Sequence, residues 1–153
     1  MTDASGSVSL SASRNADATA AFWLLRLFLG LRALLAGVEK FELGGTYSFA
    51  NYSTTMGKMA TGITSNSFLP LWCTKLFAMP LGYILLVLGA ALLLGIKTRL
   101  TLFVTGLVYV GLGFGLMAVQ SSDGVAWIGV YVGLNVGALL LVRHNRFALW
   151  PDK

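Results

Sequence analysis

Three uncharged apolar stretches, each long enough to cross a lipid bilayer, constrain this chain more than any other feature of its sequence. They run over residues 76–96, 100–119 and 125–142. At 1.5 Å per helical residue each covers roughly 27 to 32 Å, which is the thickness of the hydrocarbon core of a bilayer. A fourth apolar stretch, residues 20–43, is interrupted by Arg26 and Arg32. The sequence therefore predicts four transmembrane helices.

Composition agrees with a membrane protein and excludes several other classes. Only 11% of the residues are charged, whereas soluble domains carry about 25%. The single cysteine, Cys73, excludes an intramolecular disulfide, and the single histidine, His144, excludes the usual clustered metal sites. The net charge of +5 comes from residues at the ends of the apolar segments, so membrane topology explains it better than a nucleic-acid partner does.

The short links between the last three apolar stretches indicate the architecture. Residues 97–99 and 120–124 are too few to allow anything but antiparallel neighbours. We therefore expect an all-α, integral membrane four-helix bundle of up-down topology over residues 20–145. Residues 1–19 are rich in Ser, Ala, Thr and Asp and predict a flexible polar tail. Residues 146–153 form the other cytoplasmic end.

The only long connection, residues 44–75, has a helical pattern of its own. Apolar side chains recur at steps of three and four residues while polar residues fill much of the opposite face; the apolar positions are Phe49, Tyr52, Met56, Met59 and Ile63. This pattern predicts an amphipathic helix that lies on the outer membrane surface.

Basic residues near the ends of the spans predict the orientation. With the N-terminus inside, six of them lie on the inner side and three on the outer side. The inner group is Arg14, Lys97, Arg99, Arg143, Arg146 and Lys153, and the outer group is Lys40, Lys58 and Lys75. We therefore expect both termini in the cytoplasm.

Arg32 is the residue that most needs a partner, because a charge inside the hydrocarbon costs about 2.5 to 3.5 kcal/mol on insertion scales. It lies about 18 Å into its span. Glu39, seven residues further along the chain, falls near the same helix face as Arg32. Asn135 in the last span shares the depth of Arg32, and Tyr109 is close enough to join a hydrogen-bond network with these residues. Such a network either locks helix packing or forms a polar pocket for a ligand head group or a proton path.

Glycines at four-residue spacing form two ridges on the last two spans. Gly111 and Gly115 form one, and Gly129, Gly133 and Gly137 form the other. Small residues at this spacing let helix backbones approach closely. The ridges pack either within this chain or against another subunit.

Two segments resemble the DoxX family of small bacterial and archaeal membrane proteins. One runs from Leu24-Leu25-Arg26-Leu27 through Leu29-Gly30 to Gly37-Val38-Glu39-Lys40-Phe41, and the other is Leu94-Gly95-Ile96-Lys97-Thr98-Arg99-Leu100, similar to a Leu-Gly-x-x-Thr-Arg turn of the family. The resemblance implies four spans, an outer helical loop and a bacterial or archaeal cytoplasmic membrane. Family members often carry a glutamate near the position of Leu85, and its absence here argues against a glutamate-dependent proton or quinone reaction.

The resemblance also implies a function. Members of this family include the small quinone-reducing subunit of thiosulfate:quinone oxidoreductase and proteins associated with other redox complexes. We expect a small accessory subunit of a membrane oxidoreductase or energy-converting complex, in contact with membrane lipids and other membrane subunits and holding a quinone or lipid. The alternatives are a quinone-handling redox enzyme subunit and a small-molecule transporter.

Overall fold

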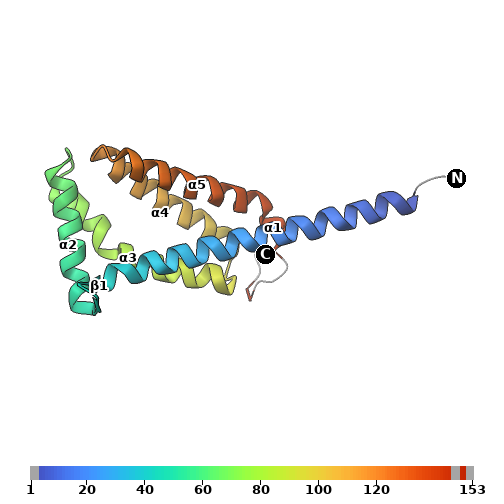
Figure 1. Ribbon diagram of the computed structural model, residues 1–153, viewed down its shortest axis with the longest axis horizontal. Helices are drawn as coiled ribbons and strands as arrows, with labels where there is room; N and C mark the ends of the chain where they lie inside the picture. The colour runs from blue at the N-terminus through green and yellow to red at the C-terminus, as the bar shows by residue number, and fades with distance from the viewer. Residues whose placement is uncertain (1–3, 146–148, 151–153) are drawn as a thin grey trace.

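The computed structural model describes residues 4–145 and 149–150, with side chains from residue 15 onward. Helices make up nearly all of it (Figure 1). In chain order the elements are α1 (Ala4–Val38), η1 (Glu39–Phe41), β1 (Glu42–Leu43), β2 (Thr46–Tyr47), α2 (Phe49–Ser65), α3 (Leu71–Leu94), α4 (Thr98–Ala118), α5 (Ser122–Leu141) and η2 (Val142–His144).

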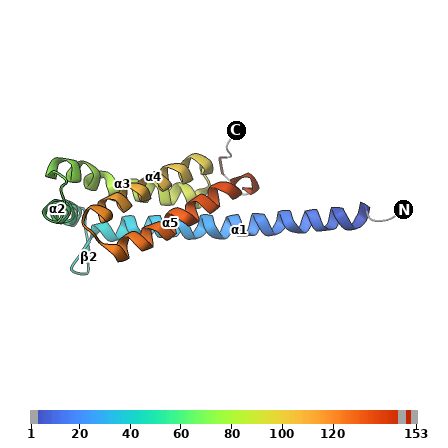
Figure 2. The same cartoon turned by 90° about the horizontal axis from the view of Figure 1, so that it is seen from above.

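Four helices form the bundle, which confirms the predicted all-α membrane fold. The segments long and apolar enough to cross a membrane are Asn15–Phe41, Leu71–Leu94, Thr98–Ala118 and Ser122–His144. Helix α1 packs mainly on α3, and α4 packs mainly on α5. Helix α2 lies across one end of the bundle (Figures 1 and 2). We call this the α2 end, and the opposite end, where α3 turns into α4, the turn end.

Helix α1 extends well beyond the turn end (Figure 2). The sequence predicts a flexible polar tail over residues 1–19, but the helix begins at Ala4. Adding residues to an existing helix needs no new nucleus, and the segment contains no proline. These two conditions allow the spanning helix to continue toward the N-terminus. Residues 1–3 lie outside the described part of the chain.

Helices α1 and α3 approach each other through glycines that lie seven residues apart. A Cβ atom added at Gly89 of α3 would lie 2.5 Å from the backbone nitrogen of Leu34 and 2.9 Å from the carbonyl oxygen of Gly30. A Cβ atom at Gly37 of α1 would lie 3.0 Å from the carbonyl oxygen of Gly82. Backbone therefore meets backbone along this contact, which is the closest packing that helices in a membrane can achieve.

The two predicted glycine ridges are used differently. A Cβ atom at Gly111 would meet the ring of Phe77 on α3 at 2.9 Å, so this position packs within the chain. Gly137 has only Leu25 at 3.9 Å, and Gly115, Gly129 and Gly133 have no neighbouring atom within 4 Å. Most of the α5 ridge therefore faces away from the described part of the chain.

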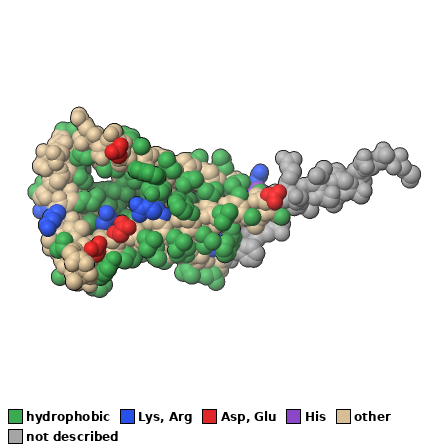
Figure 3. All heavy atoms as spheres, viewed as in Figure 1, with side chains coloured by type: hydrophobic (Ala, Val, Ile, Leu, Met, Phe, Trp, Pro, Cys, Tyr) green, Lys and Arg blue, Asp and Glu red, His purple; other side chains and the backbone are tan. Residues whose placement is uncertain are grey.

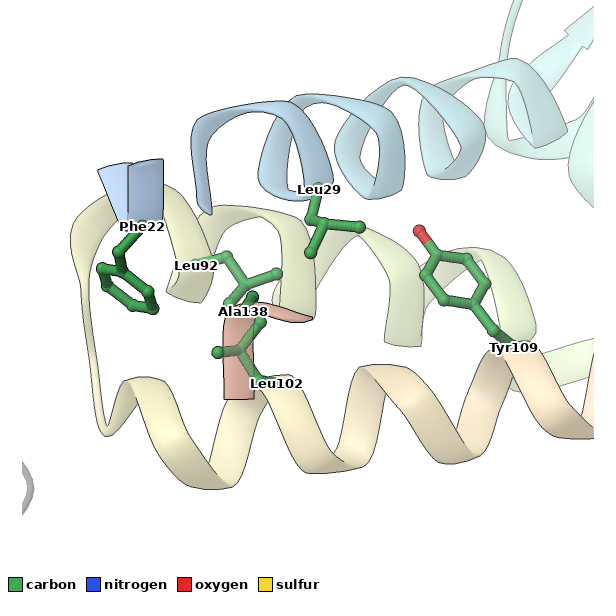
Figure 4. Close-up of a cluster of buried hydrophobic side chains, with 6 residues drawn as sticks. All are labelled: Phe22, Leu29, Leu92, Leu102, Tyr109 and Ala138. Atoms are coloured by element: carbon green, nitrogen blue, oxygen red, sulfur yellow. The ribbon is translucent and has the colours of Figure 1, made fainter. Parts of the chain in front are cut away.

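A buried apolar cluster joins the helices near the turn end (Figure 4). It contains side chains from all four spanning helices: Phe22, Leu29, Leu92, Leu102, Tyr109 and Ala138. Phe22, Leu29, Leu92 and Leu102 are completely buried. This cluster fills the space between the two helix pairs and leaves Tyr109 at its edge nearest the α2 end.

The connection between α1 and α2 contains a two-stranded hairpin that the sequence analysis did not predict. Glu42 pairs with Tyr47 and Leu43 with Thr46. Gly44 and Gly45 form the turn with φ of 60° and 80°, values that a two-residue hairpin turn requires and that glycine adopts without strain.

Tyr52 anchors α2 to α3 at a proline. Pro80 lies inside α3 and removes one hydrogen bond of the helix, because it has no N–H group. Beside it, the Tyr52 hydroxyl donates to the carbonyl of Met79 and accepts from the N–H of Gly82 at 3.1 Å. Burial raises the pKa of Tyr52, so the hydroxyl keeps its proton and remains a donor. The ring stacks on Phe41 at 4.6 Å.

The close contact between α1 and α3 predicts that a change of glycine to alanine affects stability differently at Gly89 and at Gly133. Gly89→Ala should lower the free energy of unfolding by about 1–3 kcal/mol, because the methyl group meets backbone that cannot move aside. Gly133→Ala, the matched control, should leave stability unchanged or raise it by up to about 1 kcal/mol, since it adds helix propensity in open space. Unfolding in detergent followed by circular dichroism measures both, and equal effects would contradict the packing described here.

Candidate functional site

Arg26 lies at the turn end and is bonded to the end of α3. It is 4% exposed. Its Nε donates to the carbonyl of Leu92 at 2.7 Å, its Nη2 to that of Leu93 at 3.0 Å, and its Nη1 to Oδ1 of Asn145 at 3.0 Å. The last carbonyls of a helix have no partner within the helix, and the helix dipole favours a cation there. Arg26 therefore caps α3.

Neighbouring bonds complete the turn end. Gly95 caps α3 in the left-handed region with φ of 74°. Asn145 donates through Nδ2 to the hydroxyl of Thr98 at 2.8 Å, and the backbone of Trp150 pairs with Gly95 and Lys97. The Leu-Gly-x-x-Thr-Arg turn is thus a structural joint between α3, α4 and the C-terminal segment. The described groups around Arg26 satisfy one another, which gives this arginine a structural role.

Arg32 lies nearer the α2 end and has a different environment. Its Nε donates to the hydroxyl of Tyr131 at 3.1 Å, and its Cζ lies 5.2 Å from the centre of the Tyr131 ring. The arginine thus donates a hydrogen bond to one residue of α5 and makes a cation–π contact with the ring of the same residue. Sequence reasoning missed Tyr131. The available signal was its position four residues before Asn135, on the same face of α5.

The sequence predicts that Arg32 pairs with Glu39 or Asn135, and the structure shows no hydrogen bond between Arg32 and Asn135. The side chain of Asn135 is 1% exposed, and among the described residues neither its Oδ1 nor its Nδ2 has a hydrogen-bond partner. It lies beside Gly106 of α4, where an added Cβ atom would be 3.7 Å from Oδ1. Asn135 is therefore buried in the bundle, but its side chain lies against α4 and not against Arg32 of α1.

A cavity of about 330 Å³ lies at the α2 end. Polar groups on its wall are Arg32, Glu39, Lys40, Tyr109 and Tyr131, and the apolar wall is formed by Ala36, Met59, Ile63, Phe77, Leu81, Leu85, Leu112, Gly115, Leu116, Val119 and Ile128. Figure 3 shows this face hollowed between α2 and the rest of the bundle, with basic and acidic side chains along one edge of the hollow. The structure thus brings Arg32, Glu39 and Tyr109 to one cavity and leaves Asn135 outside it.

Tyr109 contributes a buried hydroxyl to the cavity. Its side chain is 3% exposed, and its hydroxyl has no hydrogen-bond partner among the described residues. Figure 4 shows the hydroxyl directed from α4 toward α1. The Tyr109 ring lies 5.7 Å from that of Tyr131. A buried hydroxyl without a partner costs free energy, so this group favours a ligand that can bond to it.

The donors on the cavity wall outnumber the acceptors. Arg32 uses Nε for Tyr131, and the structure records no hydrogen bond from its two terminal nitrogens to any described residue. Glu39 is exposed, and no ion pair joins it to Arg32 in the described part of the chain. No group of three or more His, Cys, Asp and Glu that could hold a metal occurs among the described residues. The site therefore suits a ligand with an acceptor head and an apolar body.

These features define a class: a small four-span membrane protein with one arginine in a structural joint and a second in a ligand-sized cavity. A family model of DoxX matches residues 21–118, well over half of the chain, and the chain therefore belongs to the DoxX family. Helix α5, with Tyr131 and Asn135, lies beyond the matched residues. Searches of curated proteins and of solved structures gave no significant match.

The bonds of Arg26 predict a large loss of stability when it is replaced. Arg26→Leu should lower the free energy of unfolding by on the order of 3 kcal/mol, because each buried acceptor left unpaired costs about 1–3 kcal/mol. Arg143→Leu, at an exposed arginine of the same end, is the control and should have little effect. Thermal unfolding of both variants in detergent makes the comparison. Equal midpoints would show that Arg26 does not hold the turn end together.

Proposed function

We propose that this DoxX-family membrane protein is a small accessory subunit of a membrane oxidoreductase or other energy-converting complex. The observation that carries the proposal is the open face of α5. Only 11% of the α5 span is buried against the rest of the chain, compared with 39% for α3 and 33% for α1. Helix α5 packs on α4 and α1, but a helix with so little of its span buried has a face available for another protein.

The chemistry of this face supports a helix as its partner. Gly129 and Gly133 have open space where a side chain would be, and Val130 and Val136 beside them are about half exposed. Lipid tails are as apolar as leucine, so burial alone does not drive helices together in a membrane. Close backbone approach does, and a glycine ridge provides it.

The cavity gives the subunit a second role, as a site for a quinone or a lipid. The alternative, a quinone-handling enzyme subunit, is favoured by the donors of Arg32 and Tyr109, which suit a carbonyl oxygen. The α3 wall, however, is apolar and includes Leu85, near the position where related proteins often carry a glutamate. Quinone reduction consumes protons, and this wall offers no titratable group to deliver them.

The transporter alternative needs a polar path along the whole bundle. The polar wall residues lie at the α2 end, and beyond Tyr109 the side chains of Leu29, Leu92 and Leu102 are completely buried in the apolar cluster. That arrangement favours a site over a channel. We also propose a bacterial or archaeal cytoplasmic membrane, as the DoxX family implies. The distribution of Lys and Arg supports an orientation with both termini in the cytoplasm and the α2 end outside.

A bulky substitution on the α5 ridge tests the subunit role. Gly133→Leu should release the chain from its complex while the purified variant remains folded, because the side chain projects into open space in the isolated chain. Val110→Leu, at an exposed position on α4, is the matched control and should stay assembled. The measurement is the mass of the native complex after extraction in a mild detergent. A wild-type chain that is extracted as a monomer, or a Gly133→Leu variant that stays assembled, would contradict the proposal.

A further inference from the structure

The cavity at the α2 end has the features of a binding site for one kind of lipid. We infer that it binds an anion-headed amphiphile, with a carboxylate or phosphate head against Arg32 and Tyr109 and a hydrocarbon body along the walls formed by α3, α4 and α5. The inference names the ligand class of the cavity and does not depend on the accessory-subunit role. The volume of the cavity, about 330 Å³, lies within the range of small-molecule sites.

The donors at the site define the head group. The terminal nitrogens of Arg32 have no bonded partner among the described residues, and the Tyr109 hydroxyl is buried without one. A guanidinium group is a donor only, and its planar fork matches the two oxygens of a carboxylate or phosphate. The ligand must therefore present acceptor oxygens.

Charge distinguishes an anionic head from a neutral one. Arg32 contacts the neutral Tyr131, and the acid on the wall, Glu39, is balanced in number by Lys40. The lining thus carries one net positive charge at a depth where an uncompensated cation is costly. A neutral carbonyl could accept a hydrogen bond but would leave that charge unbalanced. An anion satisfies both requirements.

The walls and an adjoining groove define the rest of the ligand. Leu81 and Leu85 of α3 and Leu112 of α4 line the cavity beyond the polar groups. A second depression, of about 460 Å³, shares Arg32, Leu116, Ile128 and Tyr131 with the cavity and continues to Trp127, whose side chain is 65% exposed. This groove offers a hydrocarbon chain a route toward the lipid-facing surface. A small water-soluble anion would leave these apolar surfaces unfilled.

Quenching of Trp127 fluorescence tests the inference directly. The full chain is placed in nanodiscs of zwitterionic phosphatidylcholine and titrated with dibromostearate, whose bromine atoms quench tryptophan on contact. Matched probes are the methyl ester of dibromostearate, a brominated lysophosphatidate and menadione. Trp127→Phe identifies the part of the signal that reports on the groove. We expect saturable quenching by the carboxylate or the phosphate probe, and the tighter of the two identifies the natural head group.

Two variants test the assigned contacts. Arg32→Gln should weaken binding of the anionic probe at least about tenfold, as expected for loss of a charge-assisted hydrogen bond, and Tyr109→Phe should weaken it several-fold without altering the fold. If Arg32→Gln does not fold, Ala36→Leu keeps the arginine and fills the cavity, and it should abolish binding. Equal binding of the methyl ester or of menadione, or unchanged binding in these variants, would overturn the inference. Such a failure would leave the subunit role standing, because the titration requires no partner.

Discussion

The buried guanidinium of Arg26 is the interaction on which the rest of this structure depends. An arginine within a membrane span must have its donors satisfied, and the last carbonyls of α3 need partners of their own. Both needs are satisfied at once, because Arg26 donates hydrogen bonds to the carbonyls of Leu92 and Leu93. This contact fixes α1 against α3 at the turn end, and Gly30 and Gly89 then allow the two backbones to run in contact toward the α2 end.

Two arginines of α1 thereby have different environments within the same helix. Arg32 follows Arg26 by six positions. This offset turns their side chains to different faces of the helix and places them about 9 Å apart along its axis. Arg26 meets the end of α3, whereas Arg32 meets the ring and hydroxyl of Tyr131 on α5. Because the turn end is closed by backbone bonds and an apolar cluster, the α2 end can remain open enough to hold a cavity without loosening the bundle.

The apolar stretches were sufficient to predict the four helices, because length and hydropathy alone decide whether a helix spans a membrane. Partners across helices were harder to predict. Depth could be estimated from the sequence, but the rotation of each helix could not. Glu39 or Asn135 was therefore expected beside Arg32, where Tyr131 lies. Glycine spacing likewise indicates a flat helix face but not what covers it. Gly30, Gly37 and Gly89 form the tight contact, whereas Gly129 and Gly133 face open space. The Tyr52 anchor lies beside Pro80 and joins segments that are about 30 residues apart in the sequence, so no local pattern could predict it.

We infer that Arg26 stabilises the fold and that Arg32 binds a ligand. The most direct test is the rise in thermal unfolding midpoint caused by a saturating anionic lipid, compared among the wild type, Arg26→Lys and Arg32→Lys. The lysine keeps the charge but loses the planar fork. We expect Arg26→Lys to lower the midpoint without lipid and to keep the full rise, whereas Arg32→Lys should keep the midpoint and lose most of the rise. The reverse pattern, or the same response in both variants, would contradict these roles.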